Sequence, residues 1–79
     1  MSPTVLRKRG FRFFFFSREE PRKHVHVQCG HGEAKFWLRP EVELARNEGL
    51  RKKDLGIVED LIREYREDIE RAWNEHFGG

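Results

Sequence analysis

The pattern of hydrophobic and polar positions divides the chain into a strand-rich first part and a helical last part. Four runs either alternate between hydrophobic and polar residues or are rich in β-formers, as strands are: Thr4–Lys8, Phe11–Phe16, His24–Gln28 and Glu33–Leu38. Arg9-Gly10 separates the first two runs, and Gly10 permits the positive φ of a tight hairpin turn or a bulge. The polar segment Ser17–Lys23 is expected to leave the sheet.

The third and fourth runs predict a β-hairpin with a defined register. A type II′ turn with Gly30 at its first central position places Gln28 opposite Glu33 and His24 opposite Trp37. The hydrophobic residues then share one face: Val25, Val27, Ala34, Phe36 and Leu38. The other face collects the remaining residues: His24, His26, Gln28, Glu33, Lys35 and Trp37. A slip of one residue would mix the two sets, so the alternation favours this register.

The segment Pro40–Gly49 permits two interpretations. Val42 and Leu44 alternate with glutamates, which permits a short fifth strand. A helical turn that begins at Pro40 is the alternative. Asn47-Glu48-Gly49 is then expected to break the chain.

From residue 51 to about residue 77 the hydrophobic residues have helical spacing. Their positions are three and four residues apart: Leu55, Val58, Ile62, Tyr65, Ile69, Ala72 and His76. This spacing predicts one long C-terminal helix whose hydrophobic stripe packs on one face of the sheet. A coiled-coil homodimer through the same stripe is the alternative, over barely three heptads.

These elements predict a single α+β domain over residues 1–79. We expect a four- or five-stranded antiparallel sheet in the strand region 4–46, with the helix over about 51–77 packed on one face. No run reaches the roughly 18 apolar residues of a transmembrane helix, and the first residues lack the apolar stretch of a signal peptide. We therefore expect no membrane partner. The one cysteine, Cys29, cannot form an internal disulfide, and without an export signal we expect a cytoplasmic protein.

The net charge of +2 is unevenly distributed along the chain. Residues 1–40 hold nine Lys and Arg and three acids, whereas residues 41–79 hold seven Lys and Arg and eleven acids. A basic first half is typical of a surface that faces a polyanion; the alternative is two solvated faces that attract each other. Arg51, Lys52 and Lys53 begin the expected helix, where they suit a phosphate site or are simply salt-screened surface charges.

The aromatic run Arg9–Phe16 resembles the RNP1 octamer of RNA-recognition motifs, except at Arg12, where glycine or alanine is expected. Because no helix separates the early strands, we reject that fold and keep base stacking on strand aromatics as a mechanism. In a strand, Phe14 and Phe16 face away from the other phenylalanines. If they share the polar face, they join Trp37 and His24 in an exposed aromatic patch, typical of a protein or nucleic-acid partner surface.

His24 and His26 lie on one strand face, about 6.6–6.8 Å apart along the chain. Beside Arg12 and Lys35 they suit proton transfer or phosphate contact; alternatively, they are two surface histidines or two ligands of a metal. A zinc site would need a third ligand, for which the chain offers several candidates: Glu19, Glu20, Glu33 and His31. None has diagnostic spacing, so we expect no metal and no cofactor.

Most of the chain resembles a family of small bacterial proteins, the domain-of-unknown-function family 4160. The resemblance rests on five stretches: Pro3–Arg7, Gly10–Ser17, His24–Val27, Gly32–Leu38 and Trp73–Glu75. In that family the segment before the His-x-His pair is typically proline-rich, whereas here it is the more basic Pro21-Arg22-Lys23. Members are often encoded beside a second small family, numbered 2442, and are proposed as toxin–antitoxin-like pairs. The resemblance therefore implies a small partner protein from a neighbouring gene, and it carries over no catalytic residues.

Two main hypotheses of function follow. In the first, the protein is a toxin-like component that acts on RNA as a metal-independent ribonuclease, with His24 and His26 as the catalytic residues. The nucleic-acid contacts would then come from five cations and from Trp37, on which a base would stack; the cations are Arg12, Lys35, Arg51, Lys52 and Lys53. In the second, the protein is a non-enzymatic module, an antitoxin or adaptor, that docks a small partner protein through Phe14, Phe16 and Trp37. A metal-dependent hydrolase is a distant third.

Overall fold

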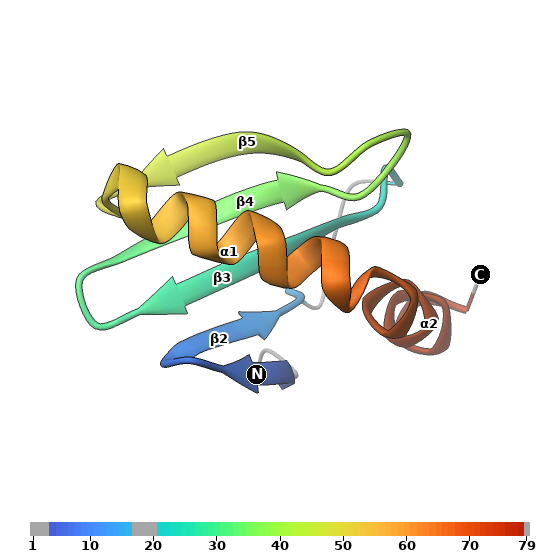
Figure 1. Cartoon of the computed structure of the whole chain (residues 1–79). Helices are drawn as coiled ribbons and strands as arrows, with labels where there is room; N and C mark the ends of the chain where they lie inside the picture. The colour runs from blue at the N-terminus through green and yellow to red at the C-terminus, as the bar shows by residue number, and fades with distance from the viewer. Residues whose placement is uncertain (1–3, 17–20, 79) are drawn as a thin grey trace.

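A computed structural model describes residues 4–16 and 21–78 and confirms an α+β fold with five antiparallel strands (Figure 1). The strands are β1 (Thr4–Lys8), β2 (Phe11–Phe14), β3 (His24–Cys29), β4 (Gly32–Trp37) and β5 (Glu43–Glu48). Two helices follow them, α1 (Lys52–Glu64) and α2 (Arg66–Phe77). The strands lie side by side in chain order, so the sheet is a simple meander. Neither helix, within the residues described, is long and apolar enough to cross a membrane.

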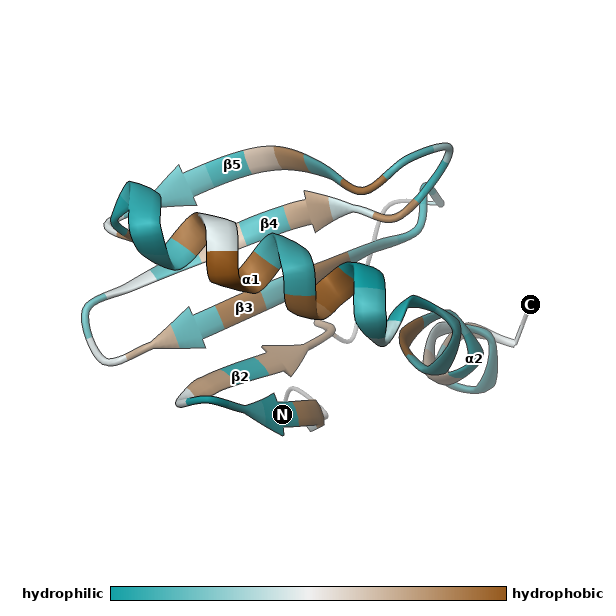
Figure 2. Cartoon of the chain, in the orientation of Figure 1, coloured by the Kyte–Doolittle hydropathy of each residue, from teal (hydrophilic) through white to brown (hydrophobic). Residues whose placement is uncertain are grey.

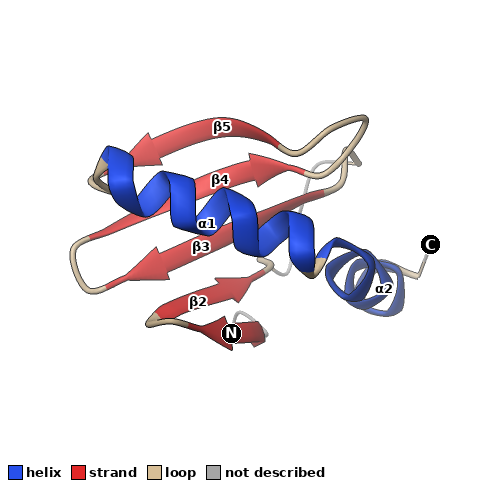
Figure 3. Cartoon of the chain, viewed as in Figure 1, coloured by secondary structure: helices blue, strands red, loops and turns tan. Residues whose placement is uncertain are grey.

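The prediction of one long C-terminal helix is wrong, because the helix bends at Tyr65. Tyr65 has φ −104° and ψ 18°, and it ends α1 and precedes α2. The Tyr65 N–H donates to the Leu61 carbonyl, and the Tyr65 carbonyl accepts from the Ile69 N–H, so helical hydrogen bonds bridge the bend. The hydrophobic spacing also continues through Tyr65, and the sequence pattern therefore does not reveal the break. Figures 1 and 3 show α1 lying across one face of the sheet, whereas α2 turns away at the sheet's end.

The core lies between α1 and the sheet face on which the hydrophobic strand residues were predicted to gather. From the helices it takes Val58, Leu61, Ile62, Ile69 and Trp73. From the strands and their connections it takes Phe11, Phe13, Phe15, Val25, Val27, Ala34, Phe36, Leu38, Val42 and Leu50. Figure 2 shows hydrophobic and hydrophilic residues interleaved along both the strands and α1, as each element needs to bury one side only.

The β3–β4 hairpin has the predicted register. Gln28 pairs with Glu33 and His24 with Trp37, and the ladder extends to Cys29 and Gly32. The predicted type II′ turn is wrong, because Gly30 is not among the described residues with positive φ. The type II′ geometry requires positive φ at that position.

The β1–β2 hairpin turns through Arg9 and Gly10, with φ of 51° and 84° respectively. Positive φ at both central residues is the mark of a type I′ turn, whose twist matches that of the flanking strands. Lys8 pairs with Phe11 on either side of this turn. Strand β2 ends at Phe14, two residues before the predicted run ends. The predicted polar break over residues 17–23 falls partly outside the described residues, since residues 17–20 are not described.

The segment after β4 forms a fifth strand, and the alternative of a helical turn is wrong. Strand β5 extends to Glu48, two residues beyond the predicted strand region. Gly49, with φ 96°, then turns the chain toward α1 and brings its backbone against Gly32. A Cβ atom on Gly32 would lie 2.7 Å from the Glu48 carbonyl oxygen. Only glycine therefore fits at the start of β4.

Candidate binding face of the sheet

The sheet face opposite α1 collects most of the side chains predicted to have a function. We call this set the aromatic–cation face: Arg12, Phe14, Phe16, Arg22, His24, His26, Lys35 and Trp37. Strand alternation places these residues here because their neighbours Val25, Val27 and Phe36 point into the core. The pairings of Phe14 with His26 and of His26 with Lys35 join the three central strands in one row.

Both candidate catalytic histidines are buried. His24 is 0% exposed and His26 is 3% exposed. The interpretation as surface histidines is therefore wrong. The His24 ring lies against Trp37 of β4 and Trp73 of α2, with centroids 5.6 Å and 5.1 Å away. Aromatic rings from neighbouring elements thus cover a strand position that alternation alone would give to solvent.

His24 is held in one orientation by a backbone carbonyl two residues earlier in the chain. Its Nδ1 lies 2.7 Å from the Arg22 carbonyl oxygen. A carbonyl can only accept, so Nδ1 carries a hydrogen and donates it. In the neutral ring this leaves Nε2 as the acceptor. The bond fixes the side chain at the first residue of β3.

Phe14 and Phe16 enclose His26 from two sides. The Phe14 ring stacks on His26 at 5.5 Å, and the Phe16 ring meets it edge-on at 4.4 Å. Phe14 is itself buried, whereas Phe16 is 39% exposed. The predicted exposed aromatic patch is therefore largely closed. Of its four predicted members only Phe16 is exposed, since Phe14 and His24 are buried and Trp37 is half-buried.

Cations cover the rings that remain. The Arg12 guanidinium lies 4.5 Å from the centre of the Phe14 ring. Arg22 and Lys35 lie 4.2 Å and 4.5 Å from the centre of the Trp37 ring. Such cation–π contacts contribute about 0.5–2 kcal/mol each, depending on their exposure. The face thus presents positive charge over an aromatic layer.

The other predicted nucleic-acid-binding residues lie elsewhere. Arg51 precedes α1 without a side-chain cap, and Lys52 and Lys53 are exposed in its first turn. Because α1 covers the opposite face of the sheet, the structure does not bring these three residues together with Arg12, Lys35 and Trp37.

One cluster that sequence reasoning missed joins the β3–β4 turn to α1. The His31 Nε2 atom lies 3.0 Å from an Asp54 carboxylate oxygen. The Cys29 Sγ atom lies 3.7 Å and 3.8 Å from the two His31 ring nitrogens. A catalytic triad needs the acid and the nucleophile on opposite nitrogens. Here the sulfur lies almost equally far from both nitrogens, and Asp54 contacts one of these same nitrogens, so the cluster lacks the triad arrangement and connects the β3–β4 turn to α1.

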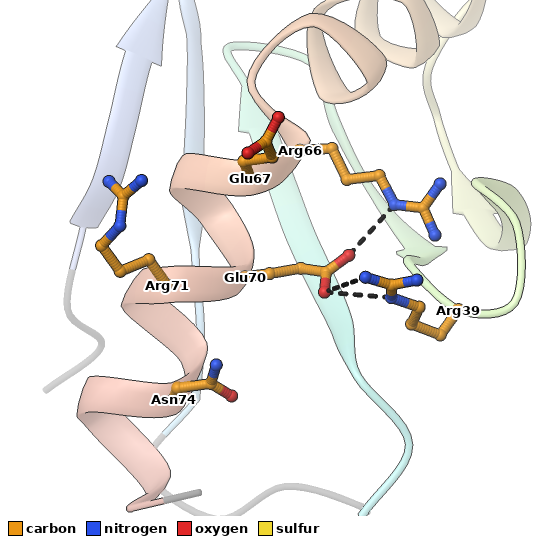
Figure 4. Close-up of a pocket in the computed structure, with 6 residues that line it drawn as sticks. All are labelled: Arg39, Arg66, Glu67, Glu70, Arg71 and Asn74. Carbon is orange, nitrogen blue, oxygen red and sulfur yellow. Dashed lines mark hydrogen bonds and ion pairs between the residues drawn. The ribbon is translucent and has the colours of Figure 1, made fainter.

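A second missed cluster centres on Glu70, which is 8% exposed (Figure 4). Arg39 donates to one Glu70 oxygen at 3.0 Å, and Arg66 donates to the other at 3.0 Å. Burial raises the pKa of Glu70, but these two hydrogen bonds and the guanidinium charges outweigh it and hold the pKa below its ordinary value. The Arg66–Glu70 spacing is visible in the sequence, whereas Arg39 is 31 residues away and gives no local signal.

Within the described residues, no group of three or more His, Cys, Asp or Glu side chains is placed to hold a metal ion. Two of the predicted third ligands, Glu19 and Glu20, lie outside those residues.

The fold and the face define a small α+β domain, a five-stranded meander with a helix across one side and an aromatic–cation layer on the other. Residues 10–74 match the family described as Domain of unknown function (DUF4160), and the chain belongs to that family. This confirms the resemblance drawn from the sequence. No curated protein and no solved structure matched the chain.

Proposed function

We propose that the protein is a non-enzymatic binding module that docks a small partner protein on its aromatic–cation face. The observation that carries the proposal is the burial of His24 and His26. A catalytic imidazole has to reach a substrate within hydrogen-bond distance. These two rings instead pack among aromatic side chains.

The exposed part of the face supports docking. Phe16 is a large exposed hydrophobic side chain that packs on Phe14 and His26. Two cations lie at these same rings: Arg12 lies over Phe14, and Lys35 pairs with His26 across the strands. Aromatic and arginine side chains are the commonest anchors of protein interfaces. A partner that offers an apolar pocket for Phe16 and carboxylates for Arg12 and Lys35 would complement this surface in shape and in charge.

The hypothesis of an RNA-acting toxin uses the same face differently. Its cations would bind phosphates, and Trp37 would stack on a base. Base stacking and catalysis would each need a rearrangement. Arg22 and Lys35 lie close to the Trp37 ring, and the two imidazoles are covered. The binding module needs no such rearrangement, and we favour it for that reason.

The test of docking is co-expression with the small protein encoded by the neighbouring gene, followed by purification and measurement of the mass of the complex in solution. We expect a complex that Phe16→Ala weakens at least about tenfold. Leu44→Ala is the matched control, since Leu44 is 40% exposed but pairs with Phe36 on the helix side of the sheet. No complex, or equal weakening by both variants, would contradict the proposal.

The test of the ribonuclease is induced expression in a bacterial host with growth and total RNA followed over time. We expect normal growth and intact RNA. Growth arrest with cleaved RNA, relieved by His24→Ala/His26→Ala, would contradict the binding module and support the toxin hypothesis. Circular dichroism must show in the same experiment that the double variant is folded.

A further inference from the structure

Independently of the aromatic–cation face, we infer that the hollow beside Glu70 is a binding site for a phosphate monoester. The hollow has a volume of about 490 Å³ and lies along α2. Its lining is almost entirely charged or polar: Arg39, Arg66, Glu67, Glu70, Arg71 and Asn74. Small-molecule sites typically have volumes of about 300–1,000 Å³.

The centre of the site holds more positive than negative charge. Three cations surround the single Glu70 carboxylate: Arg39, Arg66 and, at 3.9 Å, Lys23. Counted around the Glu70 carboxylate and including Lys23, which lies beside the hollow, the excess is two positive charges; the lining itself holds three arginines and two glutamates. A net positive site of this kind suits a phosphate monoester, which carries about −1.5 to −2 at neutral pH.

Glu70 also orients the two guanidinium groups. It binds Arg39 through Nε and Nη2, and it binds Arg66 through Nε. Arg66 Nη2 donates to the Pro40 carbonyl oxygen at 3.1 Å. Among the described residues, Nη1 of each guanidinium has no partner, and Figure 4 shows both groups on the same side of α2. Two preoriented donors of this kind suit the planar recognition of phosphate oxygens.

Of the other lining residues, one is a further hydrogen-bond donor and two do not face the two guanidinium groups. Asn74 lies one helical turn after Glu70 and brings an amide donor to the hollow. Figure 4 shows Arg71 extending from the opposite side of α2, where it binds Asp68 at 3.0 Å. The Glu67 carboxylate points away from the two guanidinium groups. The binding set is therefore Arg39, Arg66 and Asn74.

The experiment is a titration of the purified protein with inorganic phosphate at constant ionic strength, followed by ¹H–¹⁵N NMR of the arginine Nε–H and Asn74 side-chain signals. We expect saturable binding with a Kd on the order of 1 mM. Arg39→Gln, at an exposed residue that leaves the Arg66–Glu70 pair in place, should weaken binding at least about tenfold. Arg46→Gln is the matched control and should leave the Kd unchanged, because Arg46 is an exposed, ion-paired arginine of β5 that does not line the hollow.

Two further arms identify the source of the phosphate and guard against unfolding. A nucleoside 5′-monophosphate that binds more tightly than inorganic phosphate would identify a small phosphorylated molecule. A 5′-phosphorylated oligoribonucleotide that binds where its unphosphorylated form does not would identify an RNA end. Asn74→Ala, an exposed position, should weaken phosphate binding without affecting the fold. Absence of saturable binding, or equal weakening by Arg39→Gln and Arg46→Gln, would overturn the inference.

Discussion

At the scale of single residues, the most constrained position is a glycine and the most misleading ones are two histidines. Gly32 fits because its missing side chain lets the backbone of residues 48–50 approach within van der Waals distance. His24 and His26 alternate correctly with Val25 and Val27, and their shared face follows from the sequence. Their burial does not, because it depends on Trp73 of α2 and on the rings of β2.

We expect Gly32→Ala to lower the free energy of unfolding by about 2–3 kcal/mol, because its Cβ would contact backbone atoms that cannot move separately. Gly30→Ala is the control in the same turn. A Cβ there would meet nothing within 4 Å, and the φ of Gly30 does not require glycine. Its effect should stay within about 0.5 kcal/mol. Equal denaturant midpoints for the two variants would show that the close approach is absent.

At the scale of elements, the sequence pattern predicts the pairing of neighbouring strands but not the bend between the two helices. The β3–β4 register follows from alternation, since a slip of one residue would bury Lys35 and expose Phe36. The helical spacing continues through the bend at Tyr65, two helical hydrogen bonds bridge it, and no proline or glycine marks it. The position of α2 is instead set by distant contacts such as Arg39 with Glu70, which no window of sequence contains.

The Glu70 cluster predicts a pH dependence of stability. Because the pKa of Glu70 is lowered in the folded protein, its contribution is complete above the unfolded value of about 4.3 and is lost as the pH falls through the folded value. We expect Glu70→Gln to cost about 1–3 kcal/mol at pH 7 and progressively less below about pH 4.

Chemical denaturation of both proteins across this pH range measures the difference. Glu59→Gln is the control, because its exposed ion pair with Arg63 has the same helical spacing as Glu70 with Arg66. A constant difference between wild type and Glu70→Gln down to pH 3 would contradict the assigned role.

At the scale of the whole molecule, one side chain joins the two layers that the sheet separates. Trp73 lies 5.3 Å from Phe15 of the core and 5.1 Å from His24 of the aromatic–cation face, measured between ring centres. The stability of the fold and the geometry of the candidate face are therefore coupled through α2.

We expect Trp73→Ala to lower the free energy of unfolding by about 3–5 kcal/mol. It should also broaden or shift the His24 and His26 ring signals in NMR spectra. Glu75→Ala, exposed on the same helix, should change neither beyond about 0.5 kcal/mol and a local shift. Unchanged histidine signals in a folded Trp73→Ala variant would contradict the coupling between the core and the aromatic–cation face.

The meander has a consequence for how the protein is made. Each strand pairs with the strand synthesised just before it, so the sheet can form hairpin by hairpin with short loop closures as the chain leaves the ribosome. Both helices come later in the chain. Until they are synthesised, the nascent sheet exposes the phenylalanines that α1 will cover, and in that interval it is most vulnerable to aggregation and to capture by chaperones.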